Sequence, residues 1–111
     1  MFGLFKPPKE NIINKIPQHA VSNARSIEQY AAGKLNGMNE VQTNHALGFI
    51  LGVWVTNCAA SGAFQLSQRD YDYVLSLART SLKWLNDEQK EQVIGIVNEL
   101  AESGLMPRQP E

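Results

Sequence analysis

The sequence predicts an all-α fold, a single-domain bundle of four to five helices around a central apolar helix at about residues 39–62. No charged side chain occurs between Glu40 and Arg69, although charged residues make up 19% of the chain. Elsewhere apolar residues recur every three or four positions, and the period-two alternation of strands is absent. With 43% apolar residues, 111 residues are enough for one core.

Residues 1–9 are predicted to form an apolar, proline-containing N-terminal tip. Met-Phe-Gly-Leu-Phe precedes two lysines and two prolines at 6–9. This run is too short for a secretory signal, and its positive charge follows the apolar part when it should precede it. The single cysteine, Cys58, gives no disulfide framework. We therefore expect a cytoplasmic protein whose tip either folds onto its own bundle or inserts into a groove elsewhere.

The bundle domain is predicted to span residues 10–105, followed by a flexible tail at 106–111. Its first helical pattern has apolar residues three or four positions apart: Ile13, Ile16, Ala20, Ala24, Ile27, Ala31 and Leu35. Pro17 interrupts this pattern, so it either kinks one helix or separates two. Asn36-Gly37 predicts the end of the segment, because glycine readily adopts the left-handed conformation that ends helices.

Three further helices are predicted from their start signals, a capping residue followed three positions later by a polar partner. The pairs are Asn39 with Gln42, Ser67 with Asp70, and Asn86 with Gln89. The second of these helices has the apolar stripe Tyr71, Val74, Leu75, Ala78, Leu82 and Leu85. The third has Val93, Ile96, Val97, Leu100 and Ala101. Gly104 followed by Leu105 predicts a Schellman stop.

The central helix is either a membrane span or a buried core helix. Its strictly apolar run covers only residues 46–55, whereas a span needs about twenty residues. Extending the run to Leu66 places Asn57 near its midpoint, and no lysine or arginine flanks it closely. We expect burial within protein. A membrane-associated protein that uses helix 41–66 or the N-terminal tip is the alternative hypothesis.

One line of the central helix consists of small residues, namely Gly48, Gly52, Ala59 and Ala63. Small side chains let a second helix approach closely. That helix belongs either to the same chain or to a symmetry mate, and we predict a homodimer formed partly through this line.

Charge is unevenly distributed along the chain. Residues 1–34 carry five cations and two carboxylates, whereas residues 86–111 carry two cations and six carboxylates. Either the two segments pack as neighbours or face solvent, or they attract each other between subunits.

The sequence predicts no catalytic residue, no metal site and no cofactor. His19, His45 and Cys58 are the candidate ligands or nucleophiles, and none has a partner at a metal-binding spacing. Arg79 and Lys83 share a helix face with Asp72, and the net charge is −1, so we expect no nucleic-acid partner. An enzyme would need a site shared across a dimer and built from His45, Tyr71 or Asp72.

The favoured hypothesis is a small non-enzymatic protein that binds another protein, as an adaptor, a regulator or an immunity-type inhibitor. Tyr73 and Trp84 fall off the apolar stripe of their helix and are expected at the surface with Arg69. Aromatic and arginine residues are enriched in protein interfaces. Phe2 and Phe5 of the N-terminal tip complete the predicted partner-binding residues.

Overall fold

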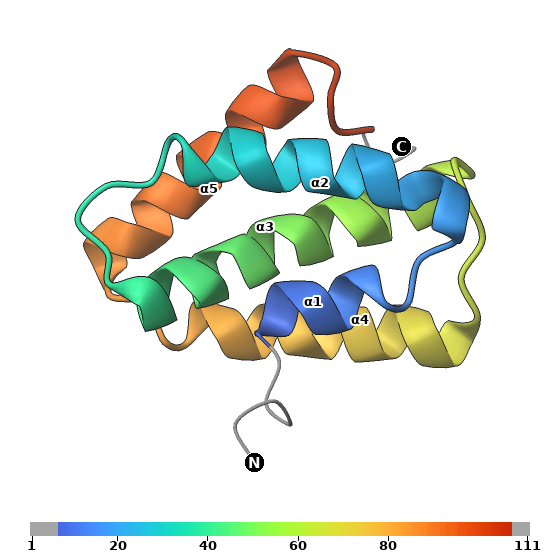
Figure 1. The fold of residues 1–111 in the computed structure, drawn as a ribbon, viewed down its shortest axis with the longest axis horizontal. Coiled ribbons are helices and arrows are strands. Elements are labelled where there is room, and N and C mark those ends of the chain that lie inside the picture. Colours follow the sequence, from blue (N-terminus) through green and yellow to red (C-terminus); the bar gives the residue numbers. More distant parts are fainter. Residues whose placement is uncertain (1–6, 108–111) are drawn as a thin grey trace.

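Five α-helices make up the fold of residues 7–107, with the longest running through the middle (Figure 1). The computed structural model describes residues 7–107, so the predicted contacts of Phe2 and Phe5 and most of the predicted tail lie outside the described part. The helices are α1 (Pro8–Ile13), α2 (Gln18–Ala32), α3 (Glu40–Ser61), α4 (Gln68–Leu82) and α5 (Asp87–Glu102). The other four pack on α3. Residues 7–107 contain no strand, and the predicted all-α bundle is confirmed.

The central helix α3 begins and ends close to the predicted residues. Asn39 accepts a hydrogen bond from the Gln42 backbone N–H, and the Gln42 side chain accepts one from the Asn39 N–H, so the capping box is present. Gly62 ends the helix with φ of 86°. Buried residues face several directions around its axis: Ala46, Leu47, Ile50, Leu51, Trp54, Val55 and Cys58. Among residues 7–107, no helix has both the length and the apolar character that crossing a bilayer requires.

Pro17 separates two helices. It occupies the N-cap position of α2, where its missing N–H is of no consequence. The predicted end of this segment at Asn36-Gly37 is wrong, because α2 already ends at Ala32. The reason is tertiary: the backbone N–H and C=O of Asn36 both hydrogen-bond to the Gln92 side chain of α5 at 3.0 Å, which draws the chain away from the helix axis.

The boundaries of α4 and α5 agree with their predicted signals. Ser67 caps α4 by accepting from the Asp70 N–H, and Asn86 with Gln89 forms a second capping box. Beyond α5, the N–H of Leu105 donates to the Leu100 C=O at 3.0 Å, which completes the predicted Schellman stop. Met106 was expected in the tail but is only 2% exposed, so the core extends one residue beyond the predicted domain.

The glycines of α3 are packing residues within one chain. A Cβ placed on Gly52 would lie 2.5 Å from the Ala78 Cβ of α4, and one on Gly48 would lie 2.7 Å from the Pro8 Cβ of α1. This part of the predicted line is therefore occupied by α1 and α4. Ala63 is exposed and lies beyond the end of α3, because Gly62 turns the chain away before the line reaches it.

Candidate functional site

Trp84 is the most exposed large apolar side chain among the described residues, at 59%. It follows α4, where the chain forms successive hydrogen bonds from each N–H to the carbonyl three residues earlier, as in a 3₁₀ turn. One of them runs from the Trp84 N–H to the Ser81 C=O at 3.1 Å. This turn buries the next side chain, Leu85, and leaves the indole on the outside. The connection between α4 and α5 thus presents a tryptophan to solvent.

The indole is held in place by His45 of α3. The two rings are stacked, with centroids 4.6 Å apart and planes inclined by 4°. Burial lowers the pKa of His45 below its ordinary value. The imidazole is therefore neutral at pH 7 and serves Trp84 as a flat, weakly polar support. Its Nδ1 atom is buried and has no hydrogen-bond partner within residues 7–107.

A cavity of about 400 Å³ lies on the other side of His45. It is formed where the start of α1 meets the first two turns of α3, and its walls are Pro7, Pro8, Glu40, Val41, Asn44 and His45. Val41 is 53% exposed at the rim. His45 thus lies between the exposed Trp84 and a cavity lined by two prolines. We call Val41, His45 and Trp84 the Trp84 surface.

The predicted partner-binding residues on α4 and just after it are all exposed but do not form one patch. Tyr73 is 40% exposed, and Arg69 is exposed one turn before it. Tyr73 and Trp84 lie on the same side of the helix, but eleven residues separate them by roughly 16 Å along the axis. The amine of Lys15 lies 5.1 Å from the Tyr73 ring centroid, so Tyr73 belongs to the contact between α4 and the end of α1.

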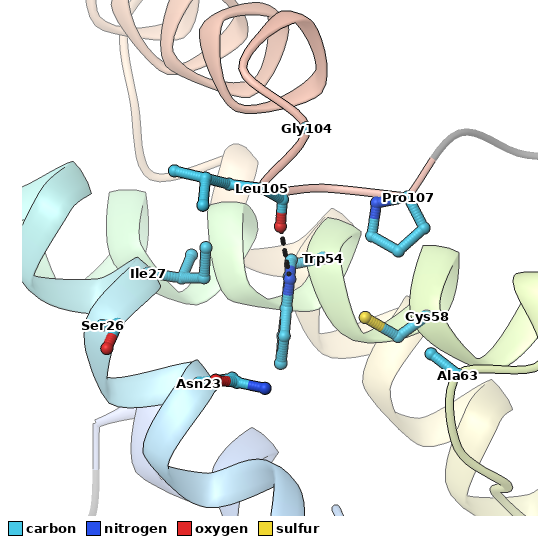
Figure 2. A pocket seen from close by; sticks show the side chains of 9 residues that line it. All are labelled: Asn23, Ser26, Ile27, Trp54, Cys58, Ala63, Gly104, Leu105 and Pro107. Atoms are coloured by element: carbon cyan, nitrogen blue, oxygen red, sulfur yellow. Dashed lines mark hydrogen bonds between the residues drawn. The ribbon is translucent and has the colours of Figure 1, made fainter.

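A second cavity, of about 320 Å³, lies where α2, the second half of α3 and the segment after α5 meet (Figure 2). The Trp54 indole N–H donates to the Leu105 backbone C=O at 3.1 Å. Cys58 lies beside Trp54, and burial raises the pKa of its thiol to about 11. The thiol is therefore protonated at neutral pH and is a poor nucleophile. The lining carries no charged side chain, so the cavity suits a small uncharged group.

The remaining candidates for chemistry are scattered. Tyr71 lines a third cavity with Ala59, near the end of α3, whereas His45 lies near its beginning. The structure therefore does not bring His45 and Tyr71 together within one chain. His19 is exposed on α2. Within residues 7–107, no three residues among His, Cys, Asp and Glu are grouped so that they could hold a metal ion.

Sequence reasoning found Trp84 but missed its neighbours. Val41 carried no signal, because a single valine in a first helical turn is unremarkable. The stacking of His45 on Trp84 depends on the register between α3 and α4. The pairing of Gly52 with Ala78 sets this register, and an isolated sequence does not reveal it.

Comparison of the chain with known proteins finds no matching family, no similar curated protein and no similar solved structure.

Proposed function

We propose that this protein acts without catalysis, by binding another protein through the Trp84 surface, in the manner of an adaptor, a regulator or an inhibitor. The observation that carries the proposal is the exposed indole of Trp84, stacked on a neutral imidazole. Tryptophan is the residue most enriched among the side chains that dominate binding energy. Because the ring is already fixed by His45, binding loses little side-chain entropy.

The chemistry of the surface describes the partner that it fits. Val41 and the two prolines make the cavity beside His45 largely apolar, and Glu40 supplies one carboxylate at its edge. A partner segment with one apolar side chain for the cavity and a nearby cation for Glu40 matches this arrangement. The second cavity does not favour an enzyme, because its thiol, Cys58, is protonated at neutral pH and its lining holds no charged group that could activate the Ser26 hydroxyl. We place the binding in the cytoplasm, as expected from the lone cysteine.

The test is affinity capture from the source cells with matched variants. Wild-type protein, Trp84→Ala, Val41→Glu and the control Ile94→Glu serve as bait, and circular dichroism verifies that each variant is folded. Ile94 is exposed to a similar degree as Val41 but lies on α5. We expect a partner that wild type and Ile94→Glu retain and that the two Trp84-surface variants lose. If all four baits capture the same proteins in the same amounts, the Trp84 surface is not the binding site.

A further inference from the structure

Neighbouring outer helices are joined by polar side chains at three junctions around α3. The α1–α2 junction has the tightest geometry, because Arg25 donates to both carboxylate oxygens of Glu10 at 2.6 and 2.9 Å. The Tyr30 hydroxyl of α2 donates to Glu99 of α5 at 2.9 Å. Lys15, just after α1, lies 4.0 Å from Asp70 of α4. These contacts order the outer helices around α3 as α4, α1, α2 and α5.

The fourth junction, between α4 and α5, is different. No hydrogen bond or ion pair joins described side chains of these two helices, and they pack on α3 with little contact between each other. Phe49 and Val53 lie about 100° around the axis of α3 from the glycines that contact α1 and α4, and from this offset we infer that they face this junction. Both side chains are only partly buried, so α3 is incompletely covered here.

Both flanks of the open junction are apolar. Lys15 contacts the Asp70 and Tyr73 side of α4, so Leu75 and Leu82 lie on the opposite side, toward the junction. Tyr30 contacts Glu99, so the far side of α5 carries Ile94 and Val97. Ile94 is 49% exposed, and the other three side chains are partly exposed. Together with Phe49 and Val53, these residues form what we call the α4–α5 face.

We propose that the α4–α5 face binds a second copy of this chain, with the two-fold axis running parallel to α3. A rotation about such an axis places α4 of one copy over α5 of the other and keeps their levels along α3 unchanged. The central helix, apolar on all sides, is then covered on its last side by its own counterpart.

Charge complementarity identifies the occupant and the direction of the axis. The end of α4 carries Arg79 and Lys83, and the start of α5 carries Asp87 and Glu91 at the same level, because one short connection joins the two helices. Lys90 is the one cation on that side of α5, so two cations of α4 meet a net charge of −1 on α5. None of these five has an ion-pair partner among the described residues. The proposed axis sets the α4 cations of each copy against the α5 carboxylates of the other. An axis perpendicular to α3 would instead place α4 against α4 and α5 against α5.

The first test compares two similar variants by sedimentation velocity on the full chain. We expect wild type to sediment as a dimer at about 100 μM, with twice the monomer mass of 12.4 kDa. Ile94→Glu places a charge in the α4–α5 face and should raise the dimer Kd at least about tenfold. The matched control Val41→Glu, on the Trp84 surface, should leave the Kd unchanged. A monomeric wild type, or equal effects of the two variants, would overturn the proposal.

The second test reverses charges. Arg79→Glu and Glu91→Arg should each weaken the dimer about tenfold, because these two residues lie at the same level and each change opposes like charges across the interface. The double variant should return the Kd close to the wild-type value, since the pair is then exchanged in both copies. Rescue of this kind also separates an interface effect from misfolding. Failure of the double variant to recover would rule out the parallel arrangement, even if the single variants weaken the dimer.

Discussion

Two sides of α3, separated by about a quarter of a turn, are packed in opposite ways. On one side Gly48 and Gly52 bring the helix so close to α1 and α4 that no Cβ fits between them. On the other, Phe49 and Val53 remain partly exposed. The distance between the axes of two packed helices increases with the size of the side chains between them. The glycines therefore allow close packing on one side of α3, whereas the large residues keep neighbouring helices farther away on the other.

The contrast also reflects the number of outer helices. A helix that is apolar all round requires neighbours on every side. In residues 7–107 four shorter helices surround it, three of their junctions are joined by polar contacts between described side chains, and one is not. We therefore expect the side with Gly48 and Gly52, the closed side, to contribute most to the stability of the monomer. The side with Phe49 and Val53, the open side, is where another molecule can add contacts.

The largest expected effect is that of Gly52→Leu on the closed side. The new side chain has no room, because even its Cβ would lie 2.5 Å from that of Ala78. We expect α3 and α4 to separate and the free energy of unfolding to fall by about 3 kcal/mol or more. Chemical denaturation followed by circular dichroism measures this change.

Gly95→Ala is the matched control. Gly95 lies within α5, and a Cβ placed on it meets nothing within 4 Å. Replacing it by alanine removes backbone freedom from the unfolded chain and should increase stability by up to about 1 kcal/mol. If Gly52→Leu were as stable as wild type, the glycines would not be closing this side.

Much of the fold was accessible from the sequence because its signals are local. Asn39, Ser67 and Asn86 each satisfy backbone donors within three residues, so their capping roles do not depend on the rest of the chain. The end of α2 was missed because Asn36 is held by Gln92, a contact between segments distant in sequence. The sequence left open whether Pro17 kinks or splits the helix, since both outcomes are compatible with its missing N–H.

The candidate site was predictable only in part for the same reason. The exposure of Trp84 follows from its position off the apolar stripe of α4, and the structure confirms it. The support from His45 depends on how α3 and α4 are aligned. The uneven charge along the chain was visible in the sequence, but it did not reveal that Lys34 pairs with Glu99 across α2 and α5 within one chain at 3.6 Å.

A second comparison uses two valines of α3 that differ only in their side of the helix. Val55 is fully buried, whereas Val53 lies on the open α4–α5 face. Val55→Ala should reduce the free energy of unfolding by about 2 kcal/mol, and Val53→Ala by less than about 1 kcal/mol in the monomer. Denaturation at a protein concentration too low for association measures both. Equal losses would show that the α4–α5 face is as well covered as the closed side.

A third comparison tests the polar junctions with two arginines. Arg25 bonds to Glu10 and also to Glu28 at 3.0 Å, whereas Arg79 has no carboxylate partner among the described residues. Arg25→Gln should lower stability by up to about 1 kcal/mol, because these charges are partly exposed and screened by water. Arg79→Gln should have no measurable effect on the monomer. Concentrated salt should reduce the difference between the two variants; a difference that is insensitive to salt would point to packing of the arginine stem instead.

The smallest effect concerns pH at His45, where the closed side reaches the Trp84 surface. Burial lowers the pKa of His45 in the folded protein below the ordinary 6.5, so the unfolded chain binds this proton more strongly. Stability from His45 is thus fully present above about pH 6.5 and is lost as the pH falls toward the lower pKa of the folded state. Wild type should lose more stability than His45→Gln between about pH 7.5 and 5.5. Trp84→Ala exposes the imidazole and should abolish this excess loss. Because the carboxylates titrate in wild type and in both variants, this result would assign the excess loss to His45. If wild type instead gained stability on acidification relative to His45→Gln, an imidazolium held against the indole would outweigh the cost of its burial.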